Sequence, residues 1–293
     1  MRETRLDQAA GLRRLAQPRP VKVIAITGGK GGVGKTLIAA NLGAALVRLG
    51  RSVMLLDADL GLANVDVVLG LKSRLNLEHV LGGECGLEDV VVTASSGLKV
   101  VPASSGSLRM ATLSRPEHAG LINAFSHLLE PLDLLLIDTA AGIGDGVVTF
   151  SEAAQHVVVV VCDEPASLTD AYGLIKVLQR RQPGCRFEVV ANMVESAAHG
   201  RSLYEKLARV TERFLGFTPA YYGHVPHDDY LRRSVRSQST VIECFPSSPS
   251  ARAIHRLAVA ADAWAGVGGA RGGIEFFMER LVRSAAYSER VAQ

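Results

Sequence analysis

Hydrophobic residues along this chain gather in short unbroken runs, which are separated by longer stretches of mixed polarity. The runs expected to form strands are residues 21–27, 51–59, 98–103, 132–139, 156–163, 186–194 and 220–225. Most are apolar throughout rather than alternating, which is typical of parallel strands buried on both faces. Helix-like runs such as 37–49, 167–180 and 249–265 lie between them. The alternation predicts an α/β fold, a doubly wound and mostly parallel sheet flanked by helices on both faces.

The most distinctive chemistry in the sequence directly follows the first expected strand. Residues 28–36 read GGKGGVGKT, in which four residues separate Gly29 from Gly34, Lys35 and Thr36. This is the spacing of a phosphate-binding loop between a strand and a helix, as in P-loop NTPases. Its glycines let consecutive backbone amides face an anion, and the N-terminus of the next helix favours negative charge. We expect Lys35 to contact the terminal phosphates of a nucleotide and Thr36 to bind the accompanying Mg²⁺.

The same loop also fits a weaker pattern, that of a dinucleotide-binding turn. Gly29, Gly31 and Gly34 read G-x-G-x-x-G, and Asp57 ends the next expected strand about twenty residues later. A dinucleotide site has no use for an adjoining Lys and Thr, whereas a triphosphate site uses both. The sequence therefore favours the phosphate-binding loop.

Acidic residues end two of the expected strands. Asp57 and Asp59 close the run 51–59, and because they are two residues apart we expect both side chains on one face, towards the loop. Asp138 ends the apolar run 132–139, and the glycine-rich stretch AAGIGDG follows at once. An acid at the tip of a buried strand, beside a flexible turn, suits a metal-bound triphosphate. This segment resembles a Walker B strand.

Composition narrows the class of protein. The chain has 293 residues, of which 48% are hydrophobic, and a formal charge of only +3. That charge comes entirely from residues 1–20, so residues 21–293 sum to zero and the body is not an obvious nucleic-acid binder. The basic run Arg232, Arg233 and Arg236 is interpreted as a solvated helix face. The four cysteines form no CxxC metal or redox pair, and they favour a reduced, cytoplasmic protein.

Four segments are expected along the chain. Residues 1–20 form a basic leader that Pro18 and Pro20 separate from the core, residues 21–265 form the nucleotide-binding domain, and residues 266–273 form a glycine linker. In residues 274–293, apolar side chains recur at helical spacing and form one stripe; they include Ile274, Phe277, Met278, Leu281 and Val282. Such a helix either packs on the body or lies on a membrane, and the linker favours the membrane.

Several stretches together resemble the MinD/ParA family of ATPases. They are KGGVGKT at 30–36, DADLGLANVD at 57–66, LLLIDTAAGIGD at 134–145, ANMV with Asn192, and VPHDDYLRRSV at 225–235. The leader LDQAAGLRRL at 6–15 is similar to that of the flagellar-number regulators called FlhG, FleN or YlxH, and MinD itself lacks such a leader.

The resemblance implies roles for individual residues. Lys30 would reach across a dimer interface to phosphates held by a second copy of the chain, and Asp59 would position the attacking water; both are therefore candidate catalytic residues. Magnesium would be held by Thr36, with Asp57 and Asp138 nearby. The ATP-binding residues would be Gly29, Lys30, Gly31, Gly32, Val33, Gly34, Lys35 and Thr36 of the loop, with Asn192, Pro226 and Asp228 on the adenine side. No NKxD-like guanine motif is present, which favours ATP.

The resemblance also implies a biological setting. The leader, with Asp7 and Gln8, would engage a signal-recognition-type GTPase that places the flagellum, and a flagellar transcription activator or basal-body component is a further expected partner. The ATP-bound homodimer would associate peripherally with the inner face of the cell membrane. Alternatives within the fold are a division-site selector of the MinD type, a DNA-partitioning ParA-type ATPase, and a protein that binds ATP without hydrolysing it. Iron–sulfur relatives are excluded because the cysteines they require are missing.

Overall fold

The computed structural model describes residues 21–59, 64–102, 132–182 and 184–264 of the chain. The expected leader, glycine linker and membrane helix, with Asp7, Gln8 and the stripe from Ile274 to Val282, lie outside the described residues. The elements in chain order are β1 (Lys22–Gly28), α2 (Lys35–Arg48), β2 (Val53–Ala58), α3 (Val65–Leu69), α4 (Leu77–Leu81), α5 (Leu87–Val90), β3 (Val92–Thr93), β4 (Lys99–Val101), β5 (Leu134–Ala141), α7 (Asp145–Ala153), β6 (His156–Val161), α8 (Pro165–Arg181), β7 (Arg186–Val194), α9 (Ala197–Leu215), β8 (Ala220–Pro226), α10 (Asp229–Arg236), α11 (Val241–Cys244) and α12 (Pro249–Ala263).

The strands form one sheet in the order β3-β4-β2-β5-β1-β6-β7-β8. All neighbouring strands are parallel except β3, which pairs antiparallel with β4. The predicted fold class, a doubly wound and mostly parallel sheet, is therefore confirmed. Parallel strands direct their carboxyl ends to one edge of the sheet, which is where such folds bind ligands.

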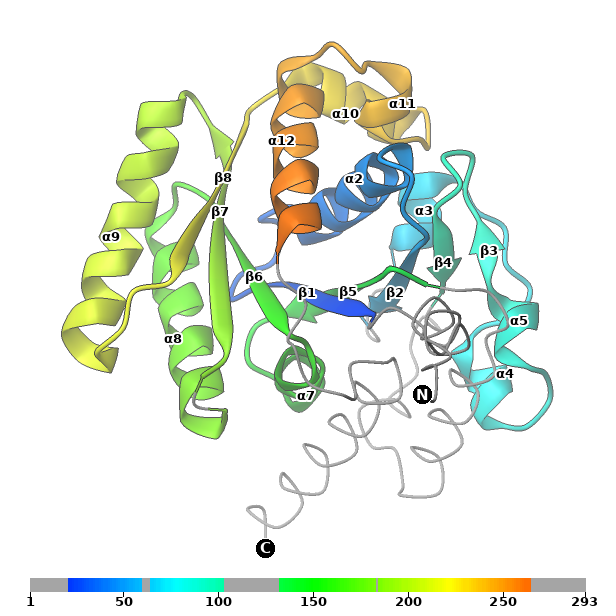
Figure 1. The fold of residues 1–293 in the computed structure, drawn as a ribbon, viewed down its shortest axis with the longest axis horizontal. Helices are drawn as coiled ribbons and strands as arrows, with labels where there is room; N and C mark the ends of the chain where they lie inside the picture. Colours follow the sequence, from blue (N-terminus) through cyan, green and yellow to red (C-terminus); the bar gives the residue numbers. More distant parts are fainter. Residues whose placement is uncertain (1–20, 60–63, 103–131, 183, 265–293) are drawn as a thin grey trace, which may run out of the picture.

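Helices cover both faces of the sheet, and side chains that alternate along each strand pack against them. On β1, Ile24 and Ile26 join the core formed with α2 and α12, whereas Val23 and Ala25 face the opposite core with α7. Figure 1 shows α2 and α12 above the sheet and α7 and α8 below it. Both faces of the central strands are therefore buried, which explains the unbroken apolar runs in the sequence.

The structure changes some of the expected boundaries. β2 ends at Ala58, so Asp59 follows the strand instead of closing it. β5 continues to Ala141, through the first residues of the expected glycine-rich turn, and α7 begins at Asp145. α9, the longest helix among the described residues, was implied only by the alternation of strands and helices. None of the helices described here is long and apolar enough to cross a membrane.

Candidate nucleotide-binding site

The phosphate-binding loop connects the carboxyl end of β1 to the start of α2, as predicted. Gly32 and Gly34 have φ angles of 79° and 91°, a left-handed conformation that residues with a Cβ rarely adopt. A Cβ on Gly34 would lie 2.4 Å from Nδ2 of Asn192, and one on Gly29 would lie 2.2 Å from the backbone carbonyl carbon of Asp170. The loop is therefore held close to β7 and α8 on one side and leaves its other side to a ligand.

Lys35 is the first residue of α2 and is buried below the loop, with 8% of its surface exposed. Burial lowers the pKa of its ammonium group, while the nearby carboxylates of Asp138 and Asp59 raise it. An ammonium group held in this way acts as a strong local charge, because little water screens it. Such a charge beneath the loop suits the predicted contact between Lys35 and the terminal phosphates of a nucleotide.

Asp138 lies on β5 directly beside Asp57 on β2, since the two are partners in the parallel register. Its carboxyl group is almost completely buried, and burial raises its pKa to about 7; a hydrogen bond with the Thr36 side chain opposes this shift. Oδ1 of Asp138 has no hydrogen-bond partner within the part of the chain that the structure describes. A buried, unpaired carboxylate oxygen next to a threonine hydroxyl suits Mg²⁺, which prefers hard oxygen ligands.

Both carboxylate oxygens of Asp57 accept hydrogen bonds from backbone amides of residues that follow β2. Its Oδ1 accepts a hydrogen bond from the backbone amide of Asp59 (3.1 Å), and its Oδ2 accepts from the amides of Asn64 and Val65 (both 3.2 Å). Burial raises the pKa of Asp57 to about 6, although these three amides lower it. Asp57 thus fixes both ends of the segment after β2 and sets the position of Asp59, whose charge reaches Lys35 and Asp138.

Lys30, for which the resemblance implies a role across a dimer interface, has a contact within its own subunit. Its ammonium group forms an ion pair with the carboxylate of Glu164, the residue that precedes α8. Both side chains are partly exposed. Lys30 and Lys35 therefore diverge, since Lys35 lies beneath the loop and Lys30 leans towards α8. The sequence analysis did not identify Glu164 as a site residue. Glu164 follows β6, which lies next to β1 in the sheet, and an acid after a buried strand was the only signal that the sequence offered.

The expected adenine-side residues lie on β7 and on the turn after β8. Nδ2 of Asn192 donates to the carbonyl oxygen of Val33 (2.8 Å), and its buried Oδ1 has no partner among the described residues. Asp228 caps α10, since Oδ1 accepts from the Tyr230 amide and Oδ2 accepts from the amide and hydroxyl of Ser250. Asp228 consequently shapes the turn that follows Pro226, and its carboxylate is already engaged there.

Comparison with known proteins identifies the family. A model described as the CobQ/CobB/MinD/ParA nucleotide binding domain matches residues 24–241. The chain belongs to this family. The predicted likeness to MinD/ParA ATPases is therefore confirmed, and with it the prediction of a Mg²⁺-dependent ATPase.

Three relatives define its place in the family. Antiactivator FleN of Pseudomonas aeruginosa is 51% identical over 96% of this chain and 100% of its own length. Flagellum site-determining protein YlxH of Helicobacter pylori is 35% identical over 81% of this chain and 80% of its own. The solved structure of septum site-determining protein MinD from Pyrococcus horikoshii, complexed with Mg-ADP, has a TM-score of 0.66 and 25% identity, over 86% of this chain and 100% of that chain. The expected grouping with flagellar regulators is confirmed.

Proposed function

We propose that this protein is an ATP-driven dimerisation switch that regulates the number or placement of flagella and hydrolyses ATP slowly. The observation that carries the proposal is the divergence of the two loop lysines: Lys35 is buried towards Asp138, and Lys30 is directed away to Glu164. Lys35 would already supply a buried cation to the phosphates within a subunit. A second, surface-placed lysine on the same loop suits a phosphate group brought by another copy of the chain.

The arrangement of acids supports hydrolysis in the closed dimer. Thr36 and Asp138 would hold Mg²⁺, and when bound this ion offsets phosphate charge and favours attack at the terminal phosphorus. Asp59 would orient the attacking water, and Asp57 would keep Asp59 in position through the amides at both ends of the connecting segment. Lys30 from the second subunit would then stabilise charge that develops on the leaving phosphates.

Asn192 supports ATP over GTP as the nucleotide. Its Nδ2 group is already bound to Val33, which leaves the buried Oδ1 as the free acceptor. The exocyclic amino group of adenine is a donor and would satisfy that oxygen, whereas the keto group of guanine would not. Pro226 and the capped turn around Asp228 would border the base.

The membrane and partner roles rest on the sequence and on the relatives. The stripe from Ile274 to Val282 would bind the inner membrane surface, and dimerisation would place two such helices on one particle. The leader, with Asp7 and Gln8, would engage a flagellar GTPase of the signal-recognition type. FleN and YlxH, whose names concern activator control and flagellar siting, resemble this chain over most of its length. A flagellar activator or basal-body component is therefore a suitable further partner, and DNA is not.

Static light scattering of an Asp59→Ala variant tests the switch. Without the residue that orients water, this variant should stay dimeric with Mg–ATP and be monomeric with ADP. Adding Lys30→Ala should return it to the monomer while it still binds ATP. The matched control adds Lys206→Ala to Asp59→Ala instead. Lys206 lies on α9, and like Lys30 it pairs with an acid that follows β6, which is Asp163 at 3.8 Å.

Two outcomes would contradict the proposal. The first is an Asp59→Ala variant that binds ATP at saturation and remains monomeric. The second is a Lys30→Ala double variant that dimerises as well as the Lys206→Ala control.

A further inference from the structure

The solvent-facing side of α12 carries positive charge and no acid. From Arg252 onward its exposed positions follow one helical stripe, i, i+3, i+4, i+7 and i+11, and they are Arg252, His255, Arg256, Val259 and Ala263. The opposite side, with Ile254 and Leu257, is buried against α2 and β8. We name this exposed row the α12 stripe. Its arginines stand near the start of the helix, and its apolar residues stand near the end.

Neither arginine of the α12 stripe has an ion-pair partner among the residues that the structure describes. The only acid of α12 is Asp262, and the Arg51 guanidinium holds it by two hydrogen bonds of 2.6 and 2.9 Å. The pKa of His224 on β8 is lowered mainly by burial and further by the positive charge of Arg256, which lies nearby. This neighbour of Arg256 therefore adds no negative charge. The α12 stripe is therefore a positive surface, although the formal charges of residues 21–293 sum to zero.

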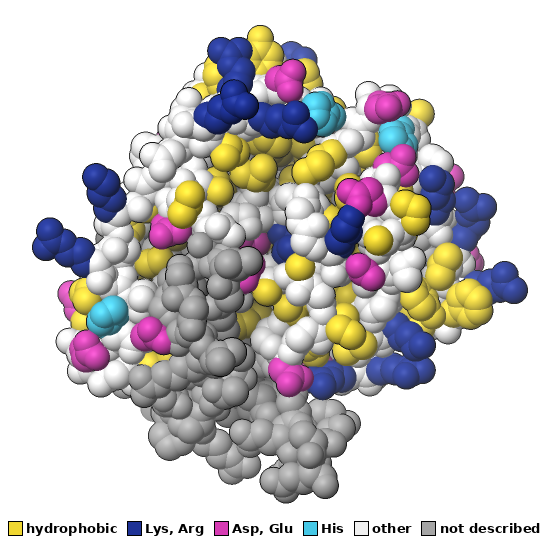
Figure 2. All heavy atoms as spheres, turned by 180° about the vertical axis from the view of Figure 1, so that it is seen from behind, with side chains coloured by type: hydrophobic (Ala, Val, Ile, Leu, Met, Phe, Trp, Pro, Cys, Tyr) yellow, Lys and Arg dark blue, Asp and Glu magenta, His cyan; other side chains and the backbone are white. Residues whose placement is uncertain are grey.

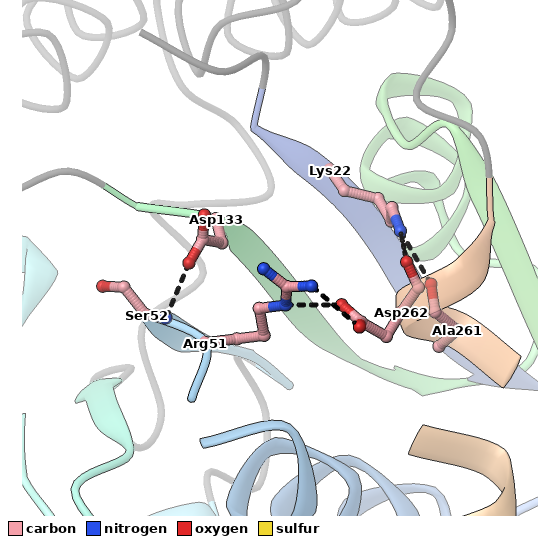
Figure 3. Close-up of polar contacts among 6 residues, drawn as sticks. All are labelled: Lys22, Arg51, Ser52, Asp133, Ala261 and Asp262. Atoms are coloured by element: carbon pink, nitrogen blue, oxygen red, sulfur yellow. Dashed lines mark hydrogen bonds and ion pairs between the residues drawn. The ribbon is translucent and has the colours of Figure 1, made fainter. Parts of the chain in front are cut away.

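The end of α12 is fixed rigidly to the sheet, as Figure 3 shows. The ammonium group of Lys22 on β1 donates to the carbonyl oxygens of Ala261 (2.7 Å) and Asp262 (3.0 Å). Trp264, which directly follows the helix, stacks on the ring of His156 at a centroid distance of 4.5 Å. Because of these contacts the α12 stripe keeps one orientation relative to the body, and its apolar end directly precedes Trp264 in the chain.

A second basic helix shows why the position of α12 matters. Lys and Arg side chains also gather at the top of the molecule in Figure 2, where α10 lies. On α10, however, Asp229 lies among the arginines, and the Arg233 guanidinium is placed over the rings of Tyr230 and Phe245. α10 also has no direct connection to the C-terminal segment, whereas α12 leads straight into it.

We propose that the α12 stripe is a second membrane contact, which binds the anionic headgroups of a phospholipid surface. This inference rests on the proposed membrane binding by residues 274–293. Those residues hold Arg280, Arg283 and Arg290 against Glu275, Glu279 and Glu289, so they supply apolar area and no net charge. Basic side chains near an anionic surface attract it within a Debye length, and the α12 stripe supplies them on the helix that precedes the C-terminal residues. Residues 274–293 would insert their apolar side chains into the membrane, and the α12 stripe would provide the preference for anionic lipid.

Vesicle flotation of the full chain with Mg–ATP tests this, with phosphatidylcholine vesicles that contain or lack phosphatidylglycerol. Arg252→Gln/Arg256→Gln should weaken binding to the anionic vesicles about 25-fold per subunit, from ~1 kcal/mol per charge. Binding to pure phosphatidylcholine should not change. The matched control is Arg209→Gln/Arg213→Gln, which removes two exposed arginines at the same spacing from α9, on the opposite face of the sheet. This control should bind like the parent, and Arg252→Lys/Arg256→Lys should restore the anionic preference.

The possible results separate the inference from the proposed function. If the stripe variant binds anionic vesicles as the parent does, or if the α9 control loses as much, the stripe is not an oriented membrane contact. If lipid binding is unchanged but binding to duplex DNA is lost, the stripe serves nucleic acid and the inference is wrong. If the parent binds no vesicle of either kind, the membrane role of the tail fails and the inference fails with it. Deletion after residue 270 identifies tail-dependent binding, since it should abolish attachment to both kinds of vesicle.

Discussion

The two edges of the sheet each hold an aspartate, and the pKa values of these two aspartates are shifted in opposite directions. At the carboxyl edge, burial raises the pKa of Asp138 to about 7, and one of its oxygens lacks a partner among the described residues. At the amino edge, Asp262 receives two hydrogen bonds from Arg51, and its pKa is lowered chiefly by them. Asp262 is hydrogen-bonded to its cation, Arg51, whereas the charge of Lys35 near Asp138 does not offset the effect of burial on the pKa of Asp138. One edge is thus arranged to receive a ligand, and the other holds the fold together.

Removing the buried cation of the ligand edge should have the largest effect. Lys35→Ala takes away the ammonium group buried beneath the phosphate-binding loop and should reduce ATP affinity about a hundredfold, since buried charge-assisted contacts contribute up to ~3 kcal/mol. Titration calorimetry with Mg–ATP measures this. Lys206→Ala on α9 should bind ATP like the parent. Retention of near-parental affinity by Lys35→Ala would mean that the phosphates bind elsewhere.

The ligand edge should also make the stability of the nucleotide-free protein depend on pH. The pKa of Asp138 is raised from 3.8 to about 7, so the folded chain binds a proton that the unfolded chain releases between these values. Stability should therefore fall as the pH rises from about 4 to 7, by an amount on the order of 4 kcal/mol at most, at ~1.4 kcal/mol per pKa unit. Asp57, also raised, acts in the same direction.

Thermal unfolding of Asp138→Asn across this pH range checks the effect. The asparagine cannot ionise, so the variant should lose most of the slope and be more stable than the parent above pH 7 without nucleotide. The parent should lose the slope when Mg–ATP is present, because ligand binding then stabilises the ionised form. A variant with the same slope as the parent would show that other groups cause the pH dependence.

The sequence predicted the parts of the molecule whose signal is local. The glycines and Lys35 follow from a motif, and the buried strands follow from apolar runs such as 132–139 and 156–163. Contacts between distant elements could not be predicted, because they depend on how the strands are ordered in the sheet. The pairing of Lys30 with Glu164 and of Arg51 with Asp262 joins residues 134 and 211 positions apart. The sequence predicted that Asp57 ends a strand beside the phosphate-binding loop, but its three amide partners, on Asp59, Asn64 and Val65, became evident only from the structure.

Substitution at the amino edge should have the smallest effect on nucleotide binding. Asp262→Asn keeps the size of the side chain and removes the charge that Arg51 binds, so the end of α12 should be held less firmly. The unfolding temperature should fall by a few degrees, and the difference from the parent should shrink at high salt, because the pair is partly exposed. Since the folded pKa of Asp262 is lowered, its contribution to stability is present above about pH 4 and is lost on further acidification.

The affinity of Asp262→Asn for Mg–ATP should stay within about twofold of the parent, since no contact of Asp262 reaches the phosphate-binding loop. A large loss of nucleotide binding in this variant would show that the two edges are coupled, and their separate roles would have to be abandoned.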